Sequence, residues 1–134
     1  MLSVDQEILY YGRGGYMENE LILASTKKSI GIPENDDHFD TEIRIHVLSA
    51  LMTLNQAGVG IEALSVSDAT RWLDFKNPEQ ENGNKYFALV PQYVFLRTKL
   101  IFDPPPPSNV QSYNEMIKEI LWRLKRAYGE VQNA

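Results

Sequence analysis

The chain has 134 residues, a hydrophobic fraction of 43% and a net charge of −5, which together indicate one globular domain and exclude wholesale disorder. It contains no cysteine, so a disulfide scaffold and thiolate metal sites are excluded. The sequence does not open with a basic segment followed by an apolar core, and no apolar run approaches the ~20 residues of a membrane-spanning helix. We therefore predict neither a signal peptide nor a membrane span.

The charge is unevenly distributed along the chain. Residues 1–82 carry 14 acidic and 6 basic residues, a net charge of −8, whereas residues 83–134 carry 4 acidic and 7 basic residues, a net charge of +3. Two interpretations stay open: helix ends charged as their dipoles prefer, or a molecule placed between two partners of different charge. The acidic total disfavours tight binding along nucleic-acid phosphates.

Residues 1–17 differ in composition from the remainder and are predicted to be a flexible arm or extension, followed by one domain over residues 18–134. The Gly-Arg-Gly-Gly of this segment lacks the Lys-Ser/Thr of a phosphate-binding loop. Its Arg-Gly-Gly codons can spell a purine-rich ribosome-binding sequence just before Met17. A second hypothesis is therefore that Met17 is the true start and that residues 1–16 are a translated leader.

A first helix is predicted over residues 18–32, closed by Gly31 and Pro33. The acidic run that follows offers Asp36, Asp37 and Asp40 as N-caps of the next helix. The run lacks the glycine at position six and the acid at position twelve of a calcium loop, so we interpret it as a helix start rather than a metal site.

The helix predicted over residues 41–56 is strongly apolar, and Gly58 and Gly60 end it. One face carries Ile43, Val47, Ala50, Leu51 and Leu54. A wider arc adds Ile45, Leu48 and Met52. A helix apolar over so wide an arc is surrounded on several sides, so it is the central helix of the core or of a subunit contact. His46 is interpreted as a hydrogen-bonded core or interface residue.

A short helix is predicted after a capping pattern at residues 65–68, and residues 77–84 are predicted to be an exposed loop. Residues 85–102 keep a helical spacing but also alternate like a strand. Because Pro91 argues against a central strand, we predict a helix with a break near Pro91.

Four consecutive prolines at residues 104–107 predict a stiff elbow, and a C-terminal helix follows over residues 108–128. Ser108 and Gln111 form a candidate capping box, and Gly129 is a candidate left-handed C-cap. The apolar stripe of this helix consists of Tyr113, Ile117, Ile120, Leu124, Ala127 and Val131.

The sequence contains no catalytic or nucleotide-binding motif, and its two histidines have no nucleophile nearby in sequence. Glu115 and Glu119 are interpreted as surface charge on the last helix. Trp122 lies off the apolar stripe, and Trp72 and Phe95 are similarly large; exposed aromatic residues favour a protein interface, while burial in the core stays an alternative. The pattern predicts an all-α protein, a small bundle of four main helices and one short helix, with no cofactor, no metal and an interaction role.

Several segments, in order, resemble the head–tail connector (adaptor) proteins of tailed bacteriophages. They are LILASTKKSIGI, DDHFDTEIRIHVLSALMTLNQAGVG, TRWLDF, YVFLRTKLIFDPP and EILWRL. The resemblance covers about residues 18–128, and its specificity comes from the order and spacing of the segments rather than from one motif. The chain departs from the pattern in its N-terminal extension, in having four prolines instead of two, and in Pro91.

The resemblance implies a structural virion protein without catalysis or cofactor. It implies a homo-oligomeric ring, a dodecamer, that docks beneath the portal protein, extends the DNA channel and offers a platform to a stopper or tail-joining protein. DNA would pass through the channel without specific binding, which suits an acidic protein. The ring would be assembled in the host cytoplasm and reside at the neck of the virion.

The resemblance also implies a portal-facing C-terminal segment, with the elbow aiming the last helix away from the core. The expected portal-facing residues are Arg123, Lys125, Arg126, Tyr128 and Val131. Because ring contacts are heterologous, the expected subunit contacts are Ile45, Leu48, Met52 and Trp122.

Two other classes of function are kept as alternatives. One is a helical protein-binding or regulatory module that is absent from the virion and acts as a monomer or dimer. The other is a small enzyme that depends on His38 or His46, which the lack of a catalytic constellation disfavours.

Overall fold

The computed structural model describes residues 15–62 and 64–132, with side chains at 17–62 and 64–129. In this part of the chain the elements are all helical, apart from one isolated bridge between Leu21 and Arg71. In order, they are α2 (Gly15–Glu18), α3 (Ile22–Ser29), α4 (Asp40–Gln56), α5 (Trp72–Phe75), the 3₁₀ helix η1 (Gly83–Tyr86), α6 (Leu89–Phe102) and α7 (Pro107–Gln132). The predicted all-α class, with four main helices and a short one, is confirmed.

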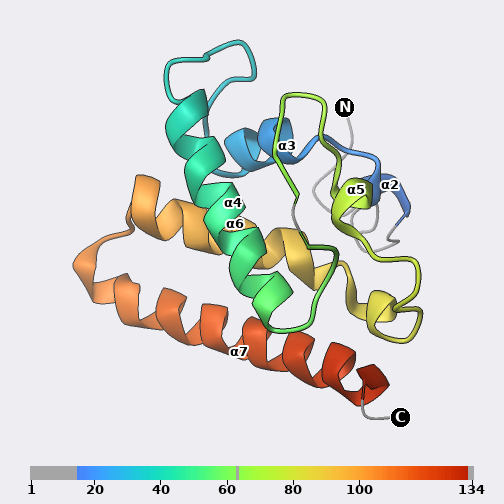
Figure 1. Ribbon diagram of the computed structural model, residues 1–134. Coiled ribbons are helices and arrows are strands. Elements are labelled where there is room, and N and C mark those ends of the chain that lie inside the picture. The colour runs from blue at the N-terminus through green and yellow to red at the C-terminus, as the bar shows by residue number, and fades with distance from the viewer. Residues whose placement is uncertain (1–14, 63, 133–134) are drawn as a thin grey trace.

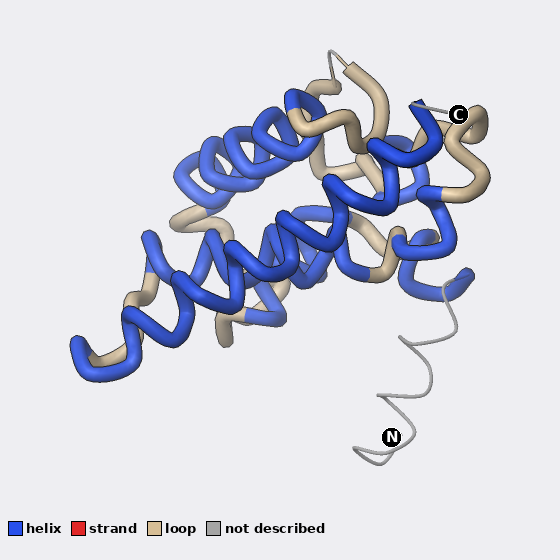
Figure 2. The backbone as a smooth tube through the Cα atoms, turned by 90° about the horizontal axis from the view of Figure 1, so that it is seen from below, coloured by secondary structure: helices blue, strands red, loops and turns tan. Residues whose placement is uncertain are grey.

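Helices α4 and α6 cross at the centre of the molecule, and α3 packs against both (Figure 1). After α6 the elbow reverses the chain, and α7 runs back beneath α6 towards η1 (Figures 1 and 2). The last helix is therefore a wall of the core, and the prediction that the elbow aims it away from the core is wrong. The elbow reverses the chain because α7 can then bury its apolar face against α6. The prolines limit the backbone of the turn but do not prevent this reversal.

The central position predicted for α4 is confirmed. Its predicted apolar face is buried, at Ile43, Val47, Ala50, Leu51 and Leu54. Gly58 and Gly60 end the helix with φ of 95° and 75°, in the left-handed region that favours glycine. The wider arc is only partly covered, because Ile45 and Met52 remain 61% and 56% exposed.

The predicted aspartate caps of α4 are wrong, because the helix has no side-chain cap and the carboxylates of Asp36 and Asp40 bind other groups. Phe39 precedes the helix without a side-chain cap. The Asp36 Oδ1 accepts a hydrogen bond from the His38 N–H at 3.2 Å, closing a local turn. The Asp40 carboxylate lies 2.8 Å from Nζ of Lys27, a buried lysine of α3 that also donates to the Glu34 carbonyl at 3.0 Å. A buried ammonium requires such partners, so this pair fixes α3 against the start of α4.

Helix α5 begins later than the capping pattern at residues 65–68 predicted. The Ser67 N–H donates to Thr70 Oγ1 at 2.8 Å, and Ser67 Oγ accepts from the Ala69 N–H at 3.2 Å, so these hydroxyls build a turn instead of a cap. Trp72 at the start of α5 is fully buried. Its Nε1–H donates to Ser25 Oγ at 2.9 Å, and its ring meets that of Phe95 edge-to-face at 5.7 Å. Burial, the alternative considered for Trp72, is what the structure shows.

The helical interpretation of residues 85–102 is confirmed and the strand alternative is wrong. Helix α6 follows η1, and Pro91 lies in its first turn. First-turn N–H groups have no acceptor within the helix, so a proline there begins the helix without breaking it.

Helix α7 begins at Pro107, so Ser108 lies in the first turn and cannot be the predicted N-cap. Proline suits the first helical position for the same reason as in α6. The predicted C-cap at Gly129 is also wrong, because the helix continues to Gln132 and Gly129 does not have a positive φ. The buried positions of α7 include Ile120 and Leu124 of the predicted stripe.

Tyr128 holds the C-terminal half of α7 in place. The side chain is fully buried, and its hydroxyl donates to Asn84 Oδ1 at 2.8 Å. Desolvation is the main reason that the pKa of Tyr128 is raised above its usual range, and the charge of Glu18 adds to the effect. Gly83 lies directly against the ring, so that a Cβ there would overlap it.

We predict that Gly83→Ala destabilises the protein by ~1–3 kcal/mol, because the added methyl group must displace the buried Tyr128 ring. Gly129→Ala is the matched control on α7. A Cβ at Gly129 meets nothing within 4 Å, so this substitution should stabilise the helix by ~0.5–1 kcal/mol. Urea denaturation of the two variants measures both effects. Equal stabilities would contradict the seating of Tyr128 against Gly83.

Candidate protein-protein interface

The described residues contain no cluster of three or more side chains able to hold a metal ion. None of the helices they form is long and apolar enough to cross a membrane. His38 is exposed in the loop before α4, and His46 is half-buried on α4, with Nε2 3.8 Å from Glu42 Oε1. The surface features that remain to be explained are exposed apolar side chains. Leu73 and Tyr86 are exposed on α5 and η1, and the others occur on three parts of the surface.

The first of these is the outward side of α4, which we call the α4 ridge. Ile45 and Met52 lie on it, seven residues apart, and both point away from the buried face of the helix. Two turns of a central helix thus present large apolar side chains to solvent. Their exposure is what a contact with another chain would remove.

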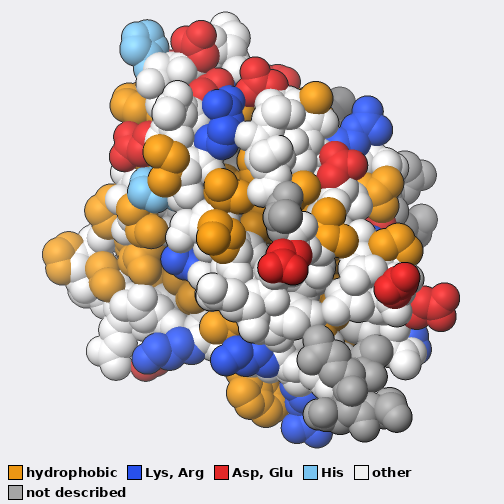
Figure 3. All heavy atoms as spheres, viewed as in Figure 1, with side chains coloured by type: hydrophobic (Ala, Val, Ile, Leu, Met, Phe, Trp, Pro, Cys, Tyr) orange, Lys and Arg blue, Asp and Glu red, His pale blue; other side chains and the backbone are white. Residues whose placement is uncertain are grey.

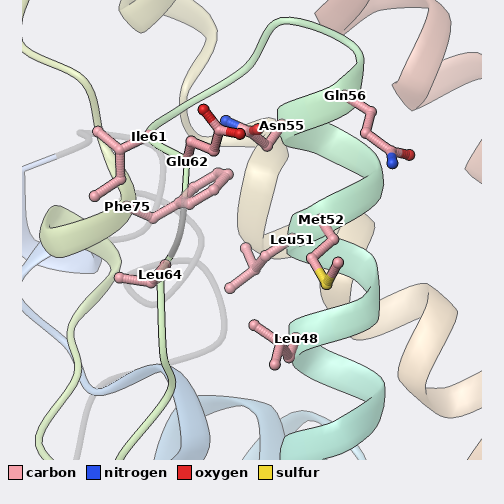
Figure 4. Close-up of a pocket in the computed structure, with 9 residues that line it drawn as sticks. All are labelled: Leu48, Leu51, Met52, Asn55, Gln56, Ile61, Glu62, Leu64 and Phe75. Atoms are coloured by element: carbon pink, nitrogen blue, oxygen red, sulfur yellow. The ribbon is translucent and has the colours of Figure 1, made fainter.

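Beside the ridge lies a hollow of about 330 Å³, which we call the α4 groove. Figure 4 shows side chains of α4 on one wall and those of Ile61, Glu62 and Leu64 on the other, with Phe75 between them. The lining residues are Leu48, Leu51, Met52, Asn55, Gln56, Ile61, Glu62, Leu64 and Phe75. The lining is mainly apolar, and Glu62 is its one charged member.

Hydrogen bonds hold the wall of the groove opposite α4. The Ile61 N–H donates to the Phe75 carbonyl at 2.9 Å. The Gln80 amide bridges the turn after α4, accepting from the Gly60 N–H at 3.1 Å and donating to the Gly58 carbonyl at 2.7 Å. These bonds hold the chain at residues 58–61, where it enters this wall of the groove.

The second surface is the outer side of α7. Trp122 is 59% exposed, and the guanidinium of Arg126 lies 5.6 Å from the centroid of its ring, a cation–π contact. Exposed basic side chains flank the indole, at Lys118, Arg123 and Lys125, and the exposed Glu119 lies one turn before it. Figure 3 shows basic side chains gathered along the lower edge, where α7 runs, with acidic ones mainly over the upper and right-hand parts.

The third surface is at the elbow, where the ring of Phe39 meets that of Phe102 edge-to-face at 5.1 Å and Ile101 is 52% exposed. Hydrophobic side chains gather at this side of the molecule, on the left in Figure 3. Sequence reasoning did not identify this surface or the far wall of the groove. Ile101 and Phe39 carry no periodic signal, and the groove depends on residues far apart in sequence.

The predicted subunit-contact residues fall on two of these surfaces. Ile45 and Met52 lie on the ridge, Leu48 lines the groove, and Trp122 lies on α7. Of the predicted portal-facing residues, Arg123, Lys125 and Arg126 are exposed, whereas Tyr128 is buried and bonded within the chain. Val131 is in α7, and its side chain lies outside the described residues, as do residues 1–14 of the predicted arm. The end of that arm, at Gly15–Glu18, forms α2, in which Met17 is buried.

Comparison with known proteins assigns the chain to a family. The sequence model of a phage connector protein family matches residues 22–131, which is most of the chain and nearly all of the described structure. The match confirms the resemblance noted in the sequence. Searches of curated proteins and of solved structures found no match.

The exposure of Trp122 can be measured directly, because the chain has two tryptophans and Trp72 is fully buried. We predict that iodide quenches part of the fluorescence of the dilute protein and that Trp122→Phe abolishes the quenchable part. Tyr86→Phe, at another exposed aromatic residue, is the control and should leave quenching unchanged. Quenching that persists unchanged in the Trp122→Phe variant would show that the quenched indole is that of Trp72, and would contradict this assignment.

Proposed function

Because the chain belongs to the phage connector protein family, whose members are structural proteins, we propose that it forms a ring between the portal protein and the tail or stopper complex and so extends the DNA channel. It would be a component of the virion neck, assembled in the host cytoplasm. The observation that carries the proposal is the exposure of large apolar side chains on two different sides of one chain, the α4 ridge and the outer side of α7.

Two different exposed apolar surfaces on one chain suit a ring better than a symmetric dimer. A two-fold dimer uses one self-complementary patch, whereas a cyclic assembly joins one surface of each copy to a different surface of the next. The acidic residues 1–82 and the basic residues 83–134 add complementary charge to such a contact. We propose that the ring contains twelve copies and so matches the portal.

The contact with the portal is proposed for the C-terminal half of α7. Arg123, Lys125 and Arg126 present exposed basic groups there, which fit an acidic partner surface. Tyr128 is left out of the contact because its side chain supports the core. The stopper or tail-joining protein would bind the opposite end of the ring.

The proposed role needs no chemistry from the protein. The net charge of −5 repels DNA phosphates at long range, so a channel extended by this protein would let DNA pass without binding it. Residues 18–134 would act as one connector domain, to which residues 1–17 are appended.

Mixing the purified protein with portal rings of the same phage tests the proposed function. We expect electron-microscopy class averages with a second ring beneath the portal, and a native mass that fits twelve copies. Disrupted virions should carry the protein at the neck in the same ratio. If the protein neither binds the portal nor occurs in virions, the proposal is wrong.

The portal contact has its own charge test. Arg123→Glu with Lys125→Glu should weaken binding to the portal about tenfold, ~1.4 kcal/mol, at low salt, and the loss should shrink as salt is added. Lys28→Glu with Lys85→Glu makes the same charge change at exposed positions on α3 and η1 and should bind normally. Equal weakening by both pairs would mean that net charge, not this end of α7, governs the contact.

A further inference from the structure

We propose that in the assembled ring Trp122 of one copy inserts into the α4 groove of the next copy, with Arg126 beside Glu62 of that groove. The inference rests on the proposed ring and names the two surfaces that join its subunits. Its argument uses the shape of the groove, the direction of Trp122 and the charges around both.

The groove can hold an indole. Its volume is about 330 Å³, whereas a cavity of ~150 Å³ already accommodates a benzene ring. Its lining offers aliphatic contacts from Leu48, Leu51 and Leu64 and an aromatic one from Phe75. A lining of this kind gains free energy when an aromatic side chain replaces water.

The indole of Trp122 does not pack into the core of its own chain. It and the buried Leu124 point about 200° apart around α7, at 3.6 residues per turn, so the indole is directed away from the core. At 59% it is exposed to nearly the same extent as Ile45, the most exposed of the large hydrophobic residues described. Tryptophan is among the residues that contribute most when an interface buries them.

Charge favours this pairing over two grooves meeting across a two-fold axis. Arg126 already stacks on the indole, so its guanidinium would enter the contact together with the ring. Glu62, which is exposed at the groove, supplies the carboxylate that a guanidinium prefers. Two groove surfaces would instead bring two Glu62 carboxylates together.

The pairing also explains why both surfaces belong to one chain but do not fill each other. The groove lies between α4 and the side chains of Ile61, Glu62 and Leu64, whereas α7 runs along the lower edge of the molecule (Figures 1 and 4). A copy that inserts its Trp122 still offers an empty groove, so addition continues until the ring closes. In this arrangement Arg126 belongs to the subunit contact instead of the portal contact proposed above, which Arg123 and Lys125, on opposite flanks of Trp122, would make.

Two variants at exposed positions test the inference without cutting into the core. Trp122→Ala removes the inserted side chain, and Met52→Lys with Glu62→Lys makes the groove basic. Each should weaken assembly by about 30-fold or more, measured by sedimentation velocity and native mass spectrometry of the full chain. Circular dichroism checks that the variants are folded. Tyr86→Ala, at an aromatic residue outside both surfaces, should assemble like the unchanged protein.

Mixing the two variants gives the sharper result. The Trp122→Ala chain keeps its groove and the groove variant keeps its tryptophan, so the mixture should form one-to-one pairs and no rings. Rings formed by either variant alone would overturn the inference and leave the proposed function standing. So would dimers of the groove variant alone, which would show Trp122 meeting Trp122. If the unchanged protein forms no ring, alone or on the portal, the proposed function fails as well.

Discussion

The structure depends on the seating of Tyr128 between α7 and the turn that precedes α6. Its buried ring lies against Gly83, and its hydroxyl is hydrogen-bonded to Asn84. The C-terminal end of α7 is therefore fixed to a segment 44 residues earlier in the chain. At the other end of α7 the prolines of the elbow reverse the chain. With both ends held, the rotation of the helix about its axis is set. That rotation buries Leu124 and turns Trp122 to the solvent.

The packing of the main helices leaves large apolar side chains on the surface. The core is completed by one face of each main helix, and α4, although central, keeps its outward side uncovered at Ile45 and Met52. A protein that worked alone would gain solubility from polar residues there. In the ring that we propose such surfaces have a use, because each copy would bind its neighbours through two different patches.

The sequence by itself determined the helical class, the number of main helices and the family. Apolar spacing marks a helix locally, and Gly31, Gly58 and Gly60 mark the turns because they adopt a positive φ. It was less successful with helix starts. Asp40 and Ser67 are good caps in isolation, but in the folded chain Asp40 pairs with Lys27 and Ser67 with Thr70. Which partner a short polar side chain takes depends on what the fold brings near it.

Only the tertiary structure decided which large side chains are exposed and how the last helix is directed. Trp72 and Trp122 look alike in sequence, yet the first is enclosed by Ser25 and Phe95 while the second faces solvent. The elbow residues limit the local backbone, but they do not say whether α7 leaves the core or returns to it. The α4 groove likewise joins Leu48 to Phe75 across intervening turns. Burial is a property of neighbours distant in sequence, so the surfaces on which the proposed function depends appeared only when the chain was folded.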